Sequence, residues 1–369
     1  MKRVLLLGAS GSIGKNTIEV IKKHPDEFIL CGAHCHTNKP FLEKLKQEFK
    51  LKSIALSKNE DKELYTRLIE DSKPDIIVNA IASSAGLQAS FDSLRLGIDL
   101  ALANKESLVM AGDILKEEAK KRTANILPID SEHWGLFSLL EGKEKSFVKR
   151  LWLTASGGPF LHKPLDEFKD ISLNQALSHP TWKMGKKISI DSATMANKGL
   201  ELIEAVKLFD IEPEKIEVVI QPSSHVHALI QTIDGSFYAQ LSNPTMKVPI
   251  LNALSYPTII ESDVGQLDFS NLSLNFLLVQ KERYPLLWLA REALTIGNWG
   301  VLAYNAANEA AVEAFILGKI AFPHIYKVVE HIIYNQKRVE LISIDSIIEE
   351  HSAIYESTIS YIAKKNWIY

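Results

Sequence analysis

The N-terminal third of the chain alternates short apolar runs with segments whose apolar residues recur at helical spacing. Strand-like runs occupy residues 3–7, 28–33, 75–81 and 99–103. The segment 12–22, after the first run, places its isoleucines at roughly the spacing of one helical face. Short apolar runs that alternate with helices are typical of parallel strands joined by crossover helices. The pattern therefore predicts an α/β fold that opens with a Rossmann-type parallel sheet.

The hydrophobic pattern changes after residue 129 and again near residue 286. Residues 226–241 carry an Asp-Gly hairpin signal between two strand-like stretches. Residues 191–209 predict a loop followed by a helix with one apolar face. From about residue 286 onward the spacing is helical, with a capping box at Ser346 opening the last helix. A central α+β domain and a C-terminal α-helical bundle are thus expected to follow the sheet.

These changes divide the chain into segments of different character, which suits a length of 369 residues. Prolines punctuate the connection before the helical bundle. The predicted segments are an N-terminal domain, a central domain, a linker and a C-terminal helical domain, at residues 1–129, 130–255, 256–285 and 286–369.

The composition limits the classes of binding partner that we expect and the cellular compartment in which the protein would work. The net charge is 42 − 45 = −3, which argues against nucleic acid or an anionic membrane as a partner. Only two cysteines are present, so a disulfide scaffold is excluded and a reducing compartment is favoured. No apolar run approaches the roughly 20 residues that span a bilayer. The first predicted strand starts at once, so we expect no targeting peptide and a cytoplasmic protein.

A glycine-rich segment follows the first predicted strand and opens the first helix. Its glycines stand at Gly8, Gly11 and Gly14, a variant of the dinucleotide fingerprint. This spacing permits a tight turn and close approach of backbone N–H groups to a pyrophosphate at the helix N-terminus. A glycine-rich turn without a ligand is the alternative.

The end of the second strand bears on which dinucleotide binds. NAD-binding proteins usually place a carboxylate there for the ribose 2′-hydroxyl. This chain instead offers Thr37, Asn38 and Lys39, which could donate hydrogen bonds to a 2′-phosphate. The sequence therefore favours NADP over NAD. A zinc site at Cys31 and Cys35 is disfavoured, because those cysteines and the neighbouring histidines are too tightly spaced.

Two acidic segments offer oxygen ligands for a hard cation. Asp130 and Glu132 stand two residues apart, so on a strand their carboxylates would share one face. Glu201 and Glu204 share a face of the helix predicted after residue 191. Oxygen-only ligation suits Mg²⁺ or Mn²⁺ better than zinc. The alternative for Asp130 is the N-terminus of a helix, and both interpretations can hold together.

Hydroxyl, amide and ammonium groups near these acids suit a phosphate. The Ser156-Gly-Gly-Pro turn exposes N–H groups, and Ser192, Asn197 and Lys198 precede Glu201. Lys105 directly follows a buried strand, where α/β proteins place ligand contacts. Residues 179–185 combine a histidine, a tryptophan, a methionine and a glycine, as a mobile lid does. A surface loop is the alternative for that segment.

Seven motifs, taken in chain order, resemble the 1-deoxy-D-xylulose 5-phosphate reductoisomerase family over nearly the whole chain. They are Gly-Ala-Ser-Gly-Ser-Ile-Gly at 8–14, Ala-Asn-Lys-Glu-Ser at 103–107, Asp-Ser-Glu-His at 130–133, Ser-Gly-Gly-Pro-Phe at 156–160, His-Pro-x-Trp-x-Met-Gly at 179–185, Asp-Ser-Ala-Thr-Met-x-Asn-Lys-Gly-Leu-Glu at 191–201 and Asn-Ala-Ala-Asn-Glu at 305–309. The resemblance implies a homodimeric enzyme that uses NADPH and Mg²⁺ or Mn²⁺, with Co²⁺ as a further candidate. Its expected substrate is the sugar phosphate 1-deoxy-D-xylulose 5-phosphate, which it isomerises and reduces in non-mevalonate isoprenoid biosynthesis, and fosmidomycin inhibits the family.

The resemblance also implies roles by position. The NADPH-binding domain would be 1–129 and the catalytic and dimerisation domain 130–255. Cofactor contacts would come from Ser10, Gly11, Ser12, Ile13, Asn38, Asn104, Glu106 and Gly185. Metal ligands would be Asp130, Glu132 and Glu201. Substrate contacts would come from Lys105, Ser131, Glu132, Ser156, His179, Ser192, Asn197, Lys198 and Glu201. Catalysis would fall to Lys105, Asp130, Glu132, His179 and Glu201, under a lid that carries Trp182 and Met184.

One departure from the family pattern and two alternatives remain. Residues 36–38 read His-Thr-Asn where the family usually has Gly-Lys-Asn, so the contacts to the 2′-phosphate are open. Another NADP-dependent dehydrogenase of a phosphorylated small molecule would keep the loop and the phosphate residues without needing three carboxylates. A nucleotide-sensing module would bind NADPH without turnover.

Overall fold

A computed structural model describes residues 1–57, 61, 63–182, 184–365 and 367. The chain forms two compact units, which are described separately. The first unit comprises residues 1–107, 113–138 and 242–272, and the second comprises 108–112, 139–241 and 273–369. The four segments expected from the sequence differ in extent from these units and stay a prediction about functional domains.

The first unit is built on a six-stranded sheet of the predicted type. Its strand order is β3-β2-β1-β4-β5-β6, and every neighbouring pair is parallel. The strands are β1 (Lys2–Leu7), β2 (Phe28–Cys35), β3 (Ser53–Leu56), β4 (Ile76–Asn79), β5 (Asp99–Leu102) and β6 (Ile126–Pro128). Parallel pairing brings the carboxyl ends of β1, β4, β5 and β6 to one edge, where such sheets bind ligands.

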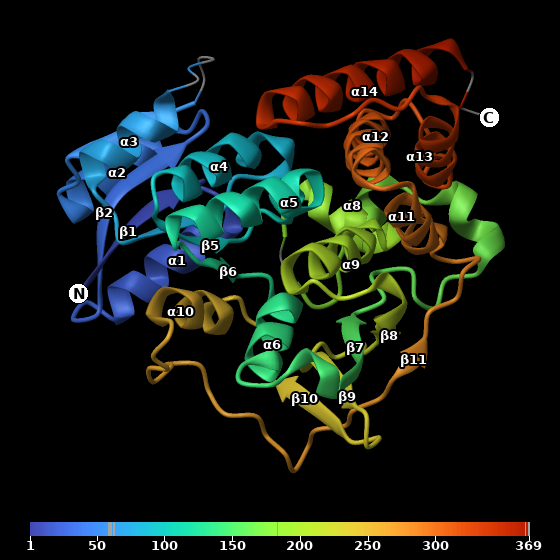
Figure 1. The fold of residues 1–369 in the computed structure, drawn as a ribbon. Coiled ribbons are helices and arrows are strands. Elements are labelled where there is room, and N and C mark those ends of the chain that lie inside the picture. Colours follow the sequence, from blue (N-terminus) through green and yellow to red (C-terminus); the bar gives the residue numbers. More distant parts are fainter. Residues whose placement is uncertain (58–60, 62, 183, 366, 368–369) are drawn as a thin grey trace. The chain divides into compact units, whose positions relative to one another are not determined.

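Helices cover both faces of this sheet. Figure 1 shows α1 and α10 on one side of it and α4 and α5 on the other. The helices are α1 (Ser12–Lys23), α2 (Lys39–Phe49), α3 (Leu64–Ser72), α4 (Leu87–Arg95), α5 (Lys105–Arg122), α6 (Ser131–Leu140) and α10 (Lys247–Ser255), with a short 3-10 helix η1 (Ser83–Gly86). The last residues of α6 and a stretch around the kink of α5 at Ala111 belong to the second unit.

The core of the first unit includes a helix from far along the chain. Val4, Leu6 and Val78 of the strands are fully buried, and Ile250 and Leu254 of α10 belong to the same cluster. The sequence predicted only a proline-punctuated connection over this stretch. A nine-residue helix forms there because its apolar side chains find a ready surface on the sheet.

The second unit contains a mixed five-stranded sheet in the order β10-β9-β7-β8-β11. Its strands are β7 (Val148–Ala155), β8 (Ile216–Ile220), β9 (Val226–Thr232), β10 (Phe237–Leu241) and β11 (Leu277–Leu278). Strands β9 and β10 pair antiparallel, so the predicted hairpin is confirmed. The turn uses Gly235 at φ +89°, a conformation that favours glycine.

The second unit also contains helices. The helices near the C-terminus form the helical region that the sequence predicted (Figure 1). The helices of this unit are α7 (Leu173–Leu177), α8 (Lys186–Thr194), α9 (Ala196–Phe209), α11 (Pro285–Ile296), α12 (Asn298–Ile316), α13 (His324–Asn335) and α14 (Ile344–Lys364), with 3-10 helices η2 (Lys145–Phe147), η3 (Leu165–Asp170) and η4 (Pro213–Lys215). No helix within the described residues is both long and apolar enough to cross a membrane.

Two element boundaries differ from the sequence prediction. Residues 191–194, expected in a loop, form the end of α8, and Met195 in the left-handed conformation (φ 60°) separates α8 from α9. The last helix is capped by Ser343 rather than Ser346, and the two serines bond reciprocally. The apolar pattern missed α8 because buried residues lie on several of its faces, which hides the amphipathic period.

Candidate functional site

The glycine-rich loop of the first unit has the geometry that a dinucleotide needs. A Cβ on Gly8, which has φ +81°, would lie 2.4 Å from the carbonyl oxygen of Ala80. A Cβ on Gly14 would lie 2.5 Å from the carbonyl oxygen of Ala9. Gly11 is the N-cap of α1 and brings no side chain to the first N–H groups of the helix. Those groups, together with the positive end of the helix dipole, suit a pyrophosphate.

Asn38 and Asn104, both expected to contact the cofactor, also cap helices. The side-chain oxygen of Asn38 accepts from the N–H of Phe41 at the start of α2. Asn104 is buried; its oxygen accepts from the N–H of Ser107, and its amide donates to the carbonyls of Ile81 and Ser83, each at 2.8 Å. Asn104 therefore joins the loop after β4 to the start of α5.

Lys105 and Asp130 meet at the carboxyl edge of the sheet. Their side chains are 7% and 11% exposed, and the ammonium lies 2.5 Å from Oδ2 of Asp130. They follow β5 and β6, whose ends Leu102 and Pro128 are register partners. The predicted position of Lys105 beside the acidic cluster is thus explained by parallel pairing alone.

The acidic cluster starts a helix instead of continuing a strand. Helix α6 begins at Ser131, and the carbonyl of Asp130 accepts from the N–H of Trp134 at 2.8 Å. The strand spacing assumed for Asp130 and Glu132 is therefore wrong, and the helix N-terminus interpretation holds. The hydroxyl of Ser131 donates to Glu132 at 2.6 Å. Carboxylates at this end of a helix are stabilised by the partial positive charge of its N–H groups.

His133 is a candidate that the sequence left without a role. Its ring is fully buried, and Nδ1 lies 3.9 Å from Oδ1 of Asp130. Two sequence signals mark this contact: His133 stands three residues after Asp130, which is about one helical turn, and it ends the Asp-Ser-Glu-His motif at 130–133.

In the second unit, Glu201 is 1% exposed and is held by side chains of its own helix α9. Asn197 donates to one carboxylate oxygen, and the ammonium of Lys198 bonds the other. Asn197 and Lys198 lie four and three residues before Glu201, so all three share one helical face. The structure therefore brings together a predicted metal ligand and two predicted phosphate contacts.

Ser156 and His179 also meet within the second unit. Nδ1 of His179 accepts from the N–H groups of Thr181 and Trp182 at 3.1 and 2.9 Å. A neutral ring bonded in this way carries its hydrogen on Nε2, which lies 3.0 Å from Oγ of Ser156. Oγ of Ser156 also accepts from the N–H of Gly158 at 3.1 Å. With two donors on its oxygen, Ser156 keeps its own proton for an acceptor such as a phosphate oxygen.

The ring of His179 is expected to stay neutral through the physiological range. Burial lowers its pKa from 6.5 to about 4. Because the folded state binds fewer protons than the unfolded state, this group opposes folding progressively as the pH falls from 6.5 to 4 and has no effect above 6.5. In a pH titration followed by NMR, the ring should not titrate between pH 5 and 8. A midpoint near 6.5 would contradict the bonding pattern.

The Ser156 turn rests against α8 near Ser192. Gly157 and Gly158 have φ of +86° and +65°, and a Cβ on Gly158 would lie 2.9 Å from the carbonyl oxygen of Ser192. Buried Tyr284 donates to the carbonyl of Gly157 at 2.6 Å, and burial raises the pKa of its phenol to about 12. Tyr284 was missed because nothing local marks a tyrosine before a helix as a support for a distant turn.

Gly185 and the rest of the lid segment lead into α8. Gly185 is the N-cap of that helix, and its carbonyl accepts from the N–H and the hydroxyl of Ser189 at 3.1 and 2.9 Å. Trp182 and Met184 are half-buried. The role of Gly185 as a cofactor contact stays a prediction.

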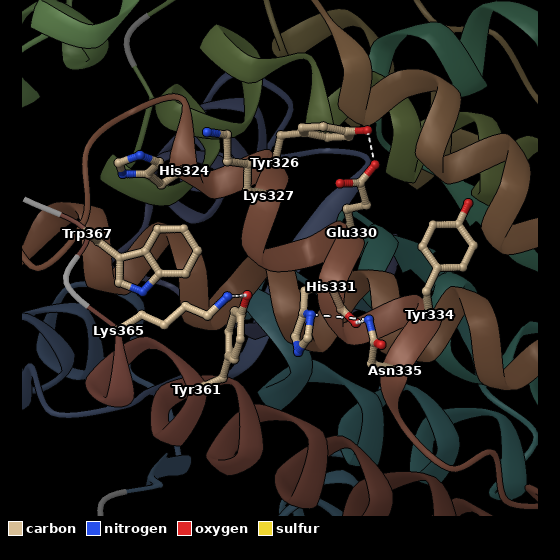
Figure 2. A pocket seen from close by; sticks show the side chains of 10 residues that line it. All are labelled: His324, Tyr326, Lys327, Glu330, His331, Tyr334, Asn335, Tyr361, Lys365 and Trp367. Carbon is tan, nitrogen blue, oxygen red and sulfur yellow. Dashed lines mark hydrogen bonds between the residues drawn. The ribbon is translucent and has the colours of Figure 1, made fainter.

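A cavity of about 630 Å³ lies elsewhere in the second unit, between α13 and α14 (Figure 2). Several of its polar groups already bond one another, including Tyr326 with Glu330 and Lys365 with Tyr361. None of the residues predicted for the site lines it. The lining residues are His324, Tyr326, Lys327, Glu330, His331, Tyr334, Asn335, Tyr361, Lys365 and Trp367.

Family models match most of the chain. A model described as the 1-deoxy-D-xylulose 5-phosphate reductoisomerase family matches residues 4–71 and 61–112. A model of the C-terminal domain of 1-deoxy-D-xylulose 5-phosphate reductoisomerase matches 126–209, and a further DXP reductoisomerase C-terminal domain model matches 241–356.

Individual relatives agree with these models. A 1-deoxy-D-xylulose 5-phosphate reductoisomerase of Treponema denticola is 48% identical over 90% of both chains, and one of Thermodesulfovibrio yellowstonii is 42% identical over 95% of this chain and 97% of its own. A crystal structure of DOX-P reductoisomerase with NADPH, fosmidomycin and magnesium superposes with a TM-score of 0.90 at 37% identity, over 98% of each chain. The Zymomonas mobilis enzyme with NADPH gives a TM-score of 0.88 at 34% identity, over 98% of this chain and 99% of that one. This chain belongs to the 1-deoxy-D-xylulose 5-phosphate reductoisomerase family.

Proposed function

We propose that this protein converts 1-deoxy-D-xylulose 5-phosphate to 2-C-methyl-D-erythritol 4-phosphate, using NADPH and a divalent cation, in non-mevalonate isoprenoid biosynthesis. The observation that carries this proposal is the 48% identity to a named reductoisomerase over 90% of both chains. The match to a crystal structure that contains NADPH, fosmidomycin and magnesium supports the same cofactors here. Crystal complexes of relatives with fosmidomycin support the proposal that this protein binds fosmidomycin too.

Asp130, Glu132 and Glu201 are proposed to hold the cation, Mg²⁺ or Mn²⁺. The donor set fits a hard cation, because all three supply carboxylate oxygens. Glu201 is almost fully buried and its carboxylate already bonds the ammonium of Lys198, so a cation would join an existing charge pair. When bound, the cation would act as a Lewis acid on the oxygens of the substrate.

The protein side chains would orient the substrate and hold its charges. Lys105, beside Asp130, can bond a substrate oxygen near the carboxylates. Ser131 orients Glu132 through its hydroxyl. His179, neutral with its hydrogen on Nε2, can donate to the substrate or to Ser156 as the lid moves. These residues would place the reacting carbons, while NADPH supplies the hydride for reduction.

The phosphate of the substrate is proposed to bind Ser156, Ser192, Asn197 and Lys198. The support is that Ser156 keeps a proton for an acceptor, and that the Gly158 turn packs on Ser192. Asn197 and Lys198 come from the first turn of α9, where N–H groups and a positive dipole end add to the attraction. Phosphate binding energy could thereby close the lid and exclude water.

Lys198→Ala is expected to raise the KM for the sugar phosphate about tenfold or more, with a smaller change in kcat. The variant removes an almost fully buried ammonium, which is a strong partner for a phosphate oxygen. Steady-state kinetics with varied substrate measure the effect. Lys215→Ala, at the surface of the same unit, is the matched control, and an unchanged KM for Lys198→Ala would count against the phosphate role.

For NADPH we propose contacts with the 10–13 loop, Asn38, Asn104, Glu106 and Gly185. The glycine geometry of the loop supports this assignment, and no carboxylate at the end of β2 opposes a 2′-phosphate. The role of Asn38 as a helix cap uses its oxygen and leaves its N–H groups for a ligand.

One assay tests the proposed function. NADPH oxidation is followed at 340 nm with 1-deoxy-D-xylulose 5-phosphate, with Mn²⁺ or Mg²⁺ and with chelator. Turnover that requires the metal is expected. Turnover on another phosphorylated substrate without metal would favour the alternative dehydrogenase, and NADPH binding without any turnover would favour a nucleotide sensor.

We also propose that the protein is a cytoplasmic homodimer. Strand β10 lies at an edge of its sheet and exposes Phe237 (54%) on one face and Tyr238 (48%) on the other, so this edge is one that a second copy could cover. Sedimentation of the wild type and of a Phe237→Ser variant tests this edge. The free thiols of Cys31 and Cys35 support a reducing compartment.

A further inference from the structure

The motif Asn305-Ala-Ala-Asn308-Glu309 on α12 belongs to the family resemblance but has had no role so far. Asn305 and Asn308 are both completely buried in a helix that is otherwise rich in alanine. A buried amide is unfavourable unless it forms hydrogen bonds, so these side chains indicate specific partners.

Asn308 bonds a buried carboxylate on α8. Its amide donates to Oδ1 of Asp191 at 2.7 Å, and the ammonium of Lys187 lies 2.8 Å from Oδ2 of the same group. Asp191 is 1% exposed. One carboxylate oxygen is therefore held from within α8 and the other from the C-terminal bundle.

Asn305 and Glu309 point in the other direction, to α14. Nδ2 of Asn305 lies 3.4 Å from Nε2 of His351, and the carboxylate of Glu309 lies 3.5 Å from the same nitrogen. Of the two asparagines, Asn308 bonds α8 and Asn305 contacts α14. Substituting one asparagine at a time therefore tests the two contacts separately.

A second contact of α12 reaches α9. A Cβ on Gly199 would lie 2.5 Å from the hydroxyl of Tyr304, so the two helices touch directly. Tyr304, next to Asn305, donates to the carbonyl of Leu286 at 3.1 Å. Helix α12 is therefore in contact with both helices that carry the proposed phosphate residues.

We propose that Asn308 is a positioning residue for the phosphate pocket, an inference that rests on the proposed function of Ser192. Asp191 and Ser192 are adjacent on α8, so the bond from Asn308 sets the rotation of that helix about its axis. That rotation decides where the hydroxyl of Ser192 points. Small displacements of a positioned group weaken binding strongly, because the polar contacts are directional.

The test compares Asn308→Ala with Asn305→Ala, two truncations of buried asparagines on one helix. Inorganic phosphate is titrated into the full-length protein by calorimetry, and KM and kcat are measured with the sugar phosphate. Asn308→Ala is expected to weaken phosphate binding and raise KM about tenfold, with kcat within about threefold. Asn305→Ala is expected to lower the melting temperature and leave the phosphate Kd within about twofold. An equal effect on Kd in both variants, or none in Asn308→Ala, overturns the inference.

A reciprocal pair covers the case in which Asn308→Ala fails to fold. Asn308→Asp places two carboxylates together, and adding Asp191→Asn restores an amide-to-carboxylate bond with the groups exchanged. The double variant is expected to bind phosphate more tightly than Asn308→Asp alone, and equal or weaker binding overturns the inference. If the wild type binds phosphate but does not turn over the sugar phosphate, the proposed function fails while this comparison still decides the role of Asn308.

Discussion

Glu201→Gln is expected to reduce turnover more than about a hundredfold at saturating Mg²⁺. The substitution keeps the shape of the side chain and removes the negative charge that a divalent cation requires. It also leaves the buried ammonium of Lys198 facing a neutral amide. The variant loses the charge of a proposed metal ligand and also the charged partner of Lys198. We therefore expect a larger loss of turnover from this substitution than from the others.

The measurement is the rate of NADPH oxidation at increasing Mg²⁺, together with the thermal shift that Mg²⁺ produces. Glu214→Gln, an exposed carboxylate of the same unit, serves as the control and should behave like the wild type. Wild-type turnover in Glu201→Gln, with an unchanged Mg²⁺ dependence, would refute its assignment as a ligand.

Lys105→Met is expected to lower kcat/KM about a hundredfold and the free energy of unfolding by about 3 kcal/mol without metal. The ammonium and its partner Asp130 are both largely buried, so removing the ammonium deprives a buried carboxylate of a close positive charge. Added Mg²⁺ should stabilise the variant more than the wild type, because a bound cation would neutralise Asp130 in place of the lysine.

Lys105→Arg separates the two effects. It retains a positive charge for Asp130 and should keep most of the stability, while its planar head group cannot reproduce the substrate contact of an ammonium. Denaturant unfolding with and without Mg²⁺ gives the stabilities, and steady-state kinetics give the activity. Normal stability and normal turnover in Lys105→Met would mean that the ion pair with Asp130 has neither role.

The elements that could be predicted depend on neighbours in the sequence. The loop from Gly8 to Gly14 and helix α1 were expected because a strand, a glycine turn and a helix follow one another directly. The hairpin at Gly235 was expected for the same reason. The strand backbone expected at Asp130 and Glu132 was wrong, because two residues of a motif do not reveal whether a strand continues or a helix begins, but their carboxylates still lie within 4.8 Å of each other.

The elements and contacts that were missed depend on partners far along the chain. Helix α10 forms where only a connection was expected, because the sheet supplies the apolar surface that the helix covers. Tyr284 reaches Gly157, and Asn308 reaches Asp191, across more than a hundred residues. Such side chains look like ordinary helical residues until their burial is known.

The sequence by itself determined the family and predicted the cofactors and the residue types of the proposed site, because these depend on short motifs whose chemistry is local. Tertiary structure alone decided which polar groups are buried and what holds them: the ammonium of Lys105 on Asp130, the ring of His179 on Ser156 and the amide of Asn308 on Asp191. The physical reason is desolvation. A polar group removed from water must find its partner in the folded chain, and only packing determines which partner is within reach.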